Sequence, residues 1–347
     1  MDESKGTLVI GAGVSGMACA RILASSGHHV TVLDKGRGPG GRLATRVSRS
    51  GPVFDHGAQY LTARSVTFQQ QVDAWIDTGV AAKWDGRFVD LRDDGPPRAT
   101  VREAERFVGT PGMSSIVASM CASADGLDGP HHGVRVAGLE KTDAGWIAHD
   151  EAGAARGPFA RCVVSVPPPQ ARELLAGPAP MLADDLGDAT VQPTWTLMLS
   201  FDDQLDLDEP FDAAFVERQD NELSMICRNS AKPGRPAVAE SGDCWVAHAR
   251  SDWSQGHLED DRAAVAATLV AAFSRAVRRP LPTPVYAAVH RWRYANTTEP
   301  LPDRWLYDPD LGLGVCGDAC TAGSHTNIER GYLSGLGLGE RLAGNPA

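Results

Sequence analysis

The hydrophobic and polar positions divide the chain into two kinds of segment. Near both ends, short continuous apolar runs lead into glycine-rich turns and then into helical stretches. Between them, residues 194–292 carry several short apolar runs separated by polar turns. Continuous apolar runs are typical of parallel strands buried on both faces, whereas repeated short runs between turns favour antiparallel strands. The pattern therefore predicts an α/β domain built from the chain ends and a second domain with an antiparallel sheet.

The first unit reads as strand, turn, helix and strand. Residues 7–10 form an apolar run, and small and apolar residues mix from Val14 through Ala24, as in a helix that packs closely on a sheet. Gly27 suits the end of this helix. Residues 29–33, "HVTVL", predict the second strand, and Asp34 stands at its end.

The middle of the chain predicts further strands and one long helix. Residues 163–175, "VVSVPPPQARELL", read as a buried strand running into a proline-led helix, which suits an exit from the first domain. Residues 258–277 predict an amphipathic helix with Leu258, Val265, Leu269, Ala272 and Phe273 on one face. Antiparallel strands are expected at residues 194–201, 213–218, 223–229, 244–250 and 284–292.

The turn after the first strand carries chemistry. Gly11, Gly13 and Gly16 have the spacing G-x-G-x-x-G, in which the first glycine permits a tight turn, the second admits a pyrophosphate and the third allows close helix packing. The helix that follows offers free N–H groups and a partial positive charge to phosphates. Asp34 lies at the expected distance to accept hydrogen bonds from ribose hydroxyls and disfavours a 2′-phosphate. The unit therefore predicts bound FAD or NAD rather than NADP.

Charge and cysteine content narrow the class of protein. The net charge of −11 disfavours nucleic acid and anionic membranes as partners, so any anionic ligand must be held by a local set of donors. Seven scattered cysteines without a C-x-x-C pair argue against a zinc site or a disulfide framework, and no metal is expected. No signal peptide is evident and no apolar run reaches the ~18 residues of a membrane span, so we expect a cytoplasmic protein.

The residues after Asp34 favour FAD over NAD. Glycines continue through Gly40 and Gly41 into Arg42, a segment similar to the "GGR" motif of glutathione-reductase-like flavoproteins, in which the arginine contacts the FAD pyrophosphate. Arg37 and Arg46 are possible helpers, and a solvated basic loop is the alternative. Near the C-terminus, Gly317 and Asp318 resemble the Gly-Asp pair that holds the ribityl chain in those flavoproteins, followed by a helix from about Asn327. A surface turn at Asp318 is the alternative.

Several longer segments resemble the renalase family, particularly its bacterial members. In chain order they are "GPGGRLATR", "FDHGAQYLTAR", "PGMSSIVASM", "VVSVPPPQA", "RNSAKPGR", "HRWRYA" and "GVCGDA". The resemblance implies a p-hydroxybenzoate hydroxylase-like fold, with a Rossmann-type FAD domain interleaved with an antiparallel-sheet substrate domain. We expect residues 1–55, 110–168 and 290–347 in the FAD domain and residues 56–109 and 169–289 in the substrate domain.

The resemblance also implies a reaction. A renalase-like oxidase takes hydride from 2- or 6-dihydro isomers of NAD(P) onto flavin and passes the electrons to O2, giving NAD(P)+ and H2O2. A dihydropyridine becomes aromatic when it loses hydride, so the protein needs alignment and exclusion of water more than a strong base. The expected partners are therefore a dihydronicotinamide dinucleotide and O2. We expect FAD to be bound non-covalently, because Cys316 and Cys320 do not match the cysteine motif of monoamine oxidases.

Candidate site residues fall into two sets. For the catalytic side we expect Tyr60, Asn229, His248 and Trp292, with Arg228 and Arg293 as further candidates; strand packing or surface charge is the alternative for each. His56 could be a satisfied buried histidine, and Lys232 either a loop charge or a phosphate contact. Trp195, Trp245 and Trp253 are expected in the core or at the domain interface. The expected cofactor-binding residues are Gly11, Gly13, Gly16, Asp34, Lys35, Gly41, Arg42, Gly57, Ala58, Gln59 and Asp318.

Two other functions stay open at this point. An amine oxidase, or another FAD oxidase of a small organic substrate, would share the fold and differ in the pocket. Amine oxidation favours paired aromatic rings in front of the flavin, and no Tyr-Tyr pair suggests itself among five tyrosines. The third possibility is a flavin-binding module without catalysis.

Overall fold

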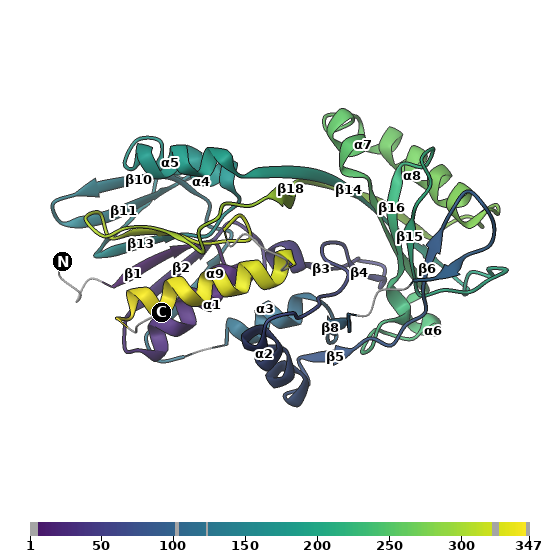
Figure 1. The fold of residues 1–347 in the computed structure, drawn as a ribbon, viewed down its shortest axis with the longest axis horizontal. Coiled ribbons are helices and arrows are strands. Elements are labelled where there is room, and N and C mark those ends of the chain that lie inside the picture. Colours follow the sequence, from purple (N-terminus) through teal and green to yellow (C-terminus); the bar gives the residue numbers. More distant parts are fainter. Residues whose placement is uncertain (1–5, 101–103, 123, 321–325, 345–347) are drawn as a thin grey trace.

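The computed structural model describes residues 6–100, 104–122, 124–320 and 326–344. Figure 1 shows two sheet-centred halves, and the long strands β14 (Thr190–Phe201) and β18 (Tyr286–Glu299) extend from one half into the other. Both described chain ends lie in the half that contains the parallel sheet (Figure 1). Among the described residues, no helix combines the length and apolar character that crossing a bilayer requires.

The first half is built on a six-stranded sheet in the order β19-β20-β13-β1-β2-β9. Its central strands are parallel and their side chains alternate between two packed faces: Val9, Val32 and Val163 face one cluster, whereas Leu8 and Val164 face the other. The strands are β1 (Thr7–Ile10), β2 (Val30–Asp34), β9 (Leu127–His132), β13 (Arg161–Val164), β19 (Leu306–Asp308) and β20 (Leu313–Val315). These strands confirm the predicted α/β fold, and both ends of the chain contribute strands to the same sheet, with β13 between them.

Helices cover one face of this sheet and a small meander covers the other. On the first face lie α1 (Val14–Ser25), α3 (Ser114–Met120) and α9 (Asn327–Leu342), with α9 beginning where the sequence predicts. On the second face, Trp146 of the meander and Leu175 of α4 share one apolar cluster with Leu8. The elements there are β10 (Val136–Thr142), β11 (Gly145–Asp150), β12 (Ala155–Phe159), α4 (Pro168–Leu175), α5 (Pro180–Asp185) and η3 (Leu186–Asp188).

The helices α1 and α9 approach closely because glycines face the contact. A Cβ atom on Gly335 would lie 2.0 Å from the carbonyl oxygen of Ser15, and one on Gly339 would lie 2.9 Å from the Cβ of Ile22. Gly331 has the same spacing of four residues, so the three glycines line one face of α9. This packing holds the start of α9 beside the start of α1, where the chain ends converge.

The second half is a seven-stranded sheet in the order β18-β14-β17-β16-β15-β6-β7. Along β14, Trp195, Leu197 and Leu199 pack on α8 (Arg262–Val277), whereas Thr194 and Thr196 point to the opposite face. The other elements of this half are β6 (Phe88–Leu91), β7 (Arg98–Ala99), β15 (Ala213–Val216), β16 (Leu223–Arg228), η4 (Asn229–Ala231), α6 (Val238–Ser241), β17 (Asp243–Ala249) and α7 (Ser251–Gly256). All the strands expected in the middle of the chain are present in an antiparallel arrangement, apart from a parallel β15–β6 pair.

The long helix of this half differs from its prediction at the start. It begins at Arg262, because the Asp261 carboxylate caps it by accepting hydrogen bonds from the amides of Ala263 and Ala264 at 2.8 and 3.2 Å. Leu258 therefore precedes the helix, and its expected place on the helical face was wrong. The apolar face comprises Val265, Leu269, Ala272, Phe273 and Ala276.

The segment after the first unit contributes to both halves. Phe68 and Trp75 of α2 (Val66–Asp77) pack their rings against Tyr332 of α9, while Phe88 begins a strand of the second sheet. The segment also includes η2 (Gly41–Leu43), the hairpin β3 (Thr45–Val47) and β4 (Val53–Asp55), and the pair β5 (Ala81–Lys83) and β8 (Phe107–Gly109). The exact division into domains stays a prediction, and the packing of α4 and α5 on the first sheet favours a boundary nearer residue 190 than residue 169.

Replacing Gly335 by alanine tests the close packing of α1 and α9. Alanine is favoured over glycine in a helix by about 1 kcal/mol, but the new methyl group would overlap a backbone carbonyl that cannot move aside. We expect Gly335→Ala to lower the free energy of unfolding by about 1–3 kcal/mol, measured by urea unfolding. Gly177→Ala is the control, because a Cβ there has no neighbour within 4 Å. Equal stability of the two variants would contradict this packing.

Candidate cofactor and substrate site

A deep cleft runs from the glycine-rich turn of the first half to the polar face of the second sheet. Its volume is about 1260 Å³, which exceeds the roughly 300–1,000 Å³ of most small-molecule pockets. Gly11 and Gly13 line one end, and Thr196, His248 and His290 line the other. The cleft is therefore large enough for an extended ligand together with a second molecule.

The three glycines of the first turn have different reasons for lacking a side chain. A Cβ on Gly11, at φ +105°, would lie 2.2 Å from the carbonyl oxygen of Ser165, and one on Gly16 would lie 1.9 Å from that of Gly11. A Cβ on Gly13 would meet nothing within 4 Å, although this residue lines the cleft. Packing therefore requires glycine at two positions, whereas at Gly13 the open space lets a ligand approach the backbone.

The start of α1 has hydrogen-bond donors that no side chain of the helix cap uses. The helix begins at Val14 after Gly13, and no side chain caps it. The hydroxyl of Ser15 is buried in the lining of the cleft and has no hydrogen-bond partner in the described part of the chain. Free backbone N–H groups and an unused hydroxyl fit a pyrophosphate at this position.

Asp34 lies at the end of β2 and shapes the loops around the cleft. One carboxylate oxygen accepts a hydrogen bond from the amide of Ala12 at 2.8 Å, and the other accepts from the amide of Gly36 at 2.7 Å. Each oxygen keeps further lone pairs for ribose hydroxyls. Lys35 also lines the cleft and donates to Gln170 at 2.9 Å, and burial lowers its pKa.

The pair of Arg42 and Asp318 joins the two ends of the chain. Two hydrogen bonds connect the side chains, one of them 2.8 Å long, and the hydroxyl of Thr297 donates to the same carboxylate at 2.7 Å. Burial would raise the pKa of Asp318, but the charge of Arg42 lowers it below the ordinary value. Arg42 and Asp318, expected at the pyrophosphate and the ribityl chain respectively, both line the cleft together with Gly41.

The chain segment after β4 crosses the cleft between the two halves. A Cβ on Gly57 would lie 2.0 Å from the carbonyl oxygen of Arg42, and the amide of Ala58 donates to the same oxygen at 2.9 Å. His56, Gly57 and Ala58 all line the cleft. The close approach requires glycine at position 57 and places this segment beside the middle of an extended ligand.

At the far end, aromatic and imidazole rings gather around a polar floor. The rings of His56 and Trp292 stack with centroids 5.2 Å apart, and His290 packs edge-on against Trp292 at 4.4 Å. Thr196 lies directly between His248 and His290 on neighbouring strands. Within the described residues, the Thr196 hydroxyl and His56 Nδ1 are buried without hydrogen-bond partners.

The histidines of this ring pocket are neutral at pH 7. Burial is the largest cause that lowers the pKa of His56, His248 and His290, in each case to about 4. The charge of Arg46 contributes to the low pKa of His56 and His290, and that of Lys232 to the low pKa of His248. The pocket thus presents neutral rings in a positive surrounding field.

Four residues expected at the site do not line the cleft: Gly16, which packs against the carbonyl of Gly11, and three residues with polar side chains. Tyr60 packs against Phe88 and Trp84, with ring centroids 5.7 and 6.4 Å away, so its placement does not support direct substrate contact. Gln59 lies one layer behind the cleft, 3.3 Å from the ring of His248. The side chain of Asn229 is hydrogen-bonded to the backbone: it accepts from the amide of Asp55 at 3.2 Å and donates to the carbonyl of Val53 at 2.9 Å.

The remaining residues singled out in the sequence also divide into those that line the cleft and those that do not. Arg228 is bound to Asp243 at 2.7 Å away from the cleft, whereas Arg293 lines the cleft and pairs with Glu259 at 2.9 Å. Trp195 and Trp245 are buried in the core of the second half, and Trp253 packs against it. Cys316 and Cys320 line the cleft.

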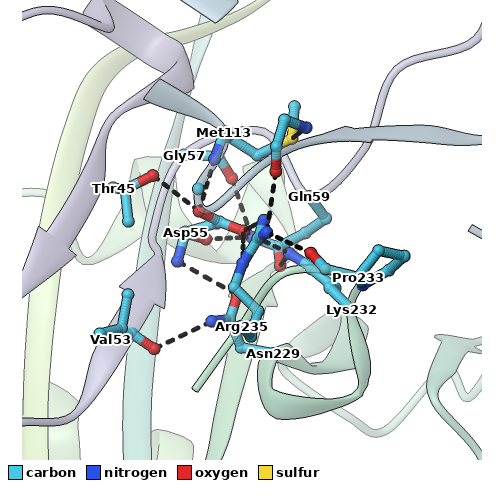
Figure 2. Close-up of polar contacts among 12 residues, drawn as sticks. Thr45, Val53, Asp55, Gly57, Gln59, Met113, Asn229, Lys232, Pro233 and Arg235 are labelled. Atoms are coloured by element: carbon cyan, nitrogen blue, oxygen red, sulfur yellow. Dashed lines mark hydrogen bonds and ion pairs between the residues drawn. The ribbon is translucent and has the colours of Figure 1, made fainter. Parts of the chain in front are cut away.

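Behind the crossing segment, a buried cluster centres on Asp55 (Figure 2). One carboxylate oxygen accepts from Thr45 at 2.7 Å and from the amide of Met113 at 2.9 Å. The other accepts from Lys232 at 3.1 Å and from Arg235. Burial alone would raise the pKa of Asp55, but the charges of Lys232 and Arg235 lower it to about 2.

Lys232 connects this cluster to the ring pocket. Its ammonium group is fully buried and donates to the Gln59 side-chain oxygen at 3.0 Å. That contact orients the Gln59 amide nitrogen toward the carbonyl oxygens of Asp55 and Gly57, at 2.6 and 2.9 Å. Lys232 is therefore a buried charge in the loop after β16, and its absence from the lining of the cleft does not support a phosphate contact.

Several of these groups carry no strong signal in the sequence. Asp55 and Arg235 meet across 180 positions, a pairing that neither periodicity nor motif spacing reveals. Thr196 and His290 lie in segments expected to be strands, and only the register of the sheet places them side by side. A buried-strand pattern interrupted by Thr and His was the one available hint.

Comparison with known sequences agrees with this geometry. Residues 9–75 match the model of an NAD(P)-binding Rossmann-like domain. Hydroxyneurosporene desaturase of Cereibacter sphaeroides is 48% identical over 59 residues, which are 17% of this chain and 12% of the desaturase. A 4,4′-diapophytoene desaturase of Staphylococcus aureus is 47% identical over 49 residues, 14% of this chain and 10% of that protein. The chain thus matches only a small part of these relatives.

Solved structures share the fold over nearly the whole chain. A protein of Exiguobacterium sp. 255-15 that carries the name protoporphyrinogen oxidase superposes with a TM-score of 0.76 at 12% identity, covering 98% of this chain and 99% of that one. Cyclohexylamine oxidase of Brevibacterium oxydans IH-35A has a TM-score of 0.71 at 10% identity, and putrescine oxidase bound to putrescine 0.69 at 11%; each comparison covers 98% and 99% of the two chains.

A second family model matches the chain from β6 to α9. Residues 89–338 match the family model described as flavin containing amine oxidoreductase, and this range covers more than half of the chain. The open turn at Gly13, the unused Ser15 hydroxyl and the groups around Asp34 and Asp318 fit the cofactor of such proteins. The protein therefore belongs to the flavin-containing amine oxidoreductase family, and its cofactor is FAD.

Proposed function

We propose that the protein is a renalase-like oxidase that removes hydride from 2- or 6-dihydro isomers of NAD(P). FAD, when bound, accepts the hydride and returns the electrons to O2, so that a dihydronicotinamide, O2 and a proton give NAD(P)+ and H2O2. The observation that carries the proposal is the ring pocket of His56, His248, His290 and Trp292, which is neutral, aromatic and lined without a carboxylate.

The charges around this pocket favour a neutral ring over an ammonium ion. The carboxylates lining the cleft in the described structure are Asp34, Glu151, Glu173 and Asp318, and none lies on the strands that form the ring pocket. Arg46 and Lys232 already lower the pKa of histidines here, so a cationic amine would meet the same unfavourable potential. A dihydropyridine carries no charge on its ring and needs no base to lose hydride.

The residues of the ring pocket orient the donor ring and exclude water from it. The stacked His56 and Trp292 offer flat apolar surfaces to a pyridine ring, and the bond from Trp292 Nε1 to the His56 carbonyl, 2.9 Å long, holds them together. Lys232 and Gln59 support the wall that carries His248. This arrangement aligns a donor ring against the cofactor and excludes water, which is what hydride transfer requires.

The family supports a second candidate, oxidation of an amine. His56 and Trp292 present flat rings to the cleft, against which a small amine would also pack, and the fold is shared with cyclohexylamine oxidase and putrescine oxidase. The positive field in the pocket is the argument against this alternative. The third possibility is a module that binds flavin without catalysis, and the experiment below distinguishes it from the proposed oxidase.

Reduction of the bound flavin under anaerobic conditions tests the choice between these functions. We expect 2- or 6-dihydro-NAD(P) to bleach the flavin spectrum in stopped-flow mixing, whereas 4-dihydro-NAD and a panel of primary amines leave it oxidised at the same concentrations. Admitting O2 should restore the colour and form one H2O2 per dihydronicotinamide. Bleaching by amines alone would establish the second candidate, and no bleaching by any donor would leave a binding module.

The pH dependence of flavin reduction tests the neutral histidines. Because the pKa values of His56, His248 and His290 are lowered to about 4, we expect the limiting rate constant of reduction to stay flat from pH 8 to pH 6 and to fall below about pH 5. Since an unfolded histidine has a pKa near 6.5, the unfolded chain binds more protons between the two values. Stability is therefore full above about pH 6.5 and decreases as the pH falls toward 4. A rate that halves near pH 6.5 would contradict the assigned charge state.

Denaturation tests the proposed non-covalent attachment of FAD. The cysteines among the described lining residues are Cys316 and Cys320, which flank Asp318 at the ribityl position rather than the ring pocket. We expect acid precipitation to release all of the flavin into the supernatant as intact FAD, identified by chromatography. Yellow colour remaining in the pellet would show a covalent bond instead.

A further inference from the structure

The cleft carries an excess of cations although the chain as a whole is acidic. The net charge is −11. Four carboxylates line the cleft, and the cations that line it are Lys35, Arg37, Arg42, Arg46, Arg135, Arg262, Arg291 and Arg293. A local excess of this kind favours anionic ligands and raises their concentration in the cleft.

Most cations near the ring pocket already have partners. Arg42 is paired with Asp318. Arg291 and Arg293 share Glu259, with one hydrogen bond of 2.9 Å from each. The hydrogen-bond donors of these three arginines are already partly engaged by carboxylates of the protein, so they are poorer candidates for holding a further anion.

Arg46 and Arg262 differ from these three arginines. Neither guanidinium forms an ion pair or hydrogen bond with another described residue. Arg37 likewise forms no ion pair or hydrogen bond with another described residue, but it lies in the loop after β2, beside Gly36. Arg46 belongs to β3, on the hairpin next to the crossing segment, and Arg262 is the first residue of α8 in the second half. Both are exposed and both line the cleft. Two unpaired guanidinium groups therefore enter one cleft from different halves of the molecule.

Their common neighbour is the ring pocket. Besides the larger effect of burial, the charges of Arg46 and Arg262 both lower the pKa of His290, so both lie within electrostatic reach of its imidazole. His290 packs on Trp292 at 4.4 Å. The two arginines thus stand near the end where a substrate ring would bind, while the pyrophosphate of FAD fits the opposite end, at Gly13 and Ser15.

The nearby acids do not cancel these two charges. Glu259 is bound to Arg291 and Arg293, and the Asp261 carboxylate is held by the amides that it caps at the start of α8. Guanidinium groups bind phosphate oxygens through pairs of parallel hydrogen bonds, which makes arginine better suited than lysine to a diphosphate. Arg46 and Arg262 are therefore free to bind an anionic group beside the ring pocket, in addition to the FAD pyrophosphate at the other end of the cleft.

We propose that Arg46 and Arg262 form a clamp for the diphosphate of the substrate dinucleotide, with its dihydronicotinamide ring in the pocket of His290 and Trp292. The inference rests on the proposed function and deepens it. It makes the substrate a complete dinucleotide rather than a free nicotinamide or a simple amine. The arginines act in binding, and the ring pocket and FAD act in the chemistry.

The test compares two donors that share a reacting ring. One is the 6-dihydro isomer of NAD, and the other is the 6-dihydro isomer of N-methylnicotinamide, which has no phosphate. For Arg46→Gln and Arg262→Gln we expect the apparent dissociation constant of the dinucleotide to rise about 10-fold each, as for the loss of a charge-assisted hydrogen bond. The limiting reduction rate should not change, because a clamp binds the ground state and the transition state equally. The phosphate-free donor should bind all variants alike.

Salt and a matched variant complete the design. Affinity of the wild type for the dinucleotide should fall as NaCl increases, and the slope should be smaller in the double variant. Arg49→Gln removes an exposed arginine from the turn of the same hairpin, outside the cleft, and should leave both donors unaffected. An unchanged dissociation constant and salt slope in the double variant would overturn the clamp, as would an equal loss for the phosphate-free donor.

Binding of NAD+ to the FAD-loaded protein separates the clamp from the reaction. It is followed by the change in the flavin absorbance spectrum and needs no turnover. If no dihydronicotinamide reduces the flavin but NAD+ binds and the double variant weakens it about 10-fold or more, the proposed function fails and the clamp stands as a dinucleotide site. If the dinucleotide is oxidised but neither variant alters its affinity or that of NAD+, the function stands and the clamp fails.

Discussion

One buried carboxylate holds the crossing segment in place between the two halves. Asp55 ends β4 and collects hydrogen bonds from the first half, through Thr45 and Met113, and from the loop after β16, through Lys232 and Arg235. All of its oxygen lone pairs point to protein donors in a place that water does not reach. Removing one partner of such a buried pair typically costs about 3–5 kcal/mol, because the remaining charge stays without compensation. The position of His56, Gly57 and Ala58 follows from this anchor, since they are the next residues along the chain.

The same cluster connects stability to the properties of the pocket. Two cations meet one carboxylate, so a positive charge remains behind the wall of the cleft. Burial is the main cause that lowers the pKa of His248, and the charge of Lys232 lowers it further. Gln59 lies between the two and contacts both side chains. In the function that we propose, this charge favours an uncharged ring over an ammonium ion. The interaction that stabilises the contact between the halves would then also contribute to the choice of substrate.

The cofactor end depends on close backbone approach instead. The glycines of α9 let it lie against α1, and Gly57 lets the crossing segment touch the backbone of Arg42. These contacts bring Asp318, from the end of the chain, to Arg42, from near its beginning. One wall of the cleft therefore carries residues from both ends of the sequence, and we propose that FAD lies along it. The substrate would then lie against the second sheet, whose polar face is the side of β14 that does not pack on α8.

The sequence by itself determined the parts that depend on local spacing. The G-x-G-x-x-G turn, the acid after the second strand, the Gly-Asp pair and the helix from Asn327 all follow from neighbours a few positions apart. The structure confirms the secondary structure of these segments, and each contributes residues to the lining of the cleft. Only the tertiary structure decided which polar groups meet. Tyr60 and Asn229 do not line the cleft, Lys232 lies behind Gln59, and Arg46 and Arg262 both line the cleft. The physical reason is that burial, pKa and charge pairing depend on long-range strand register and on domain contact, which hydrophobic periodicity does not encode.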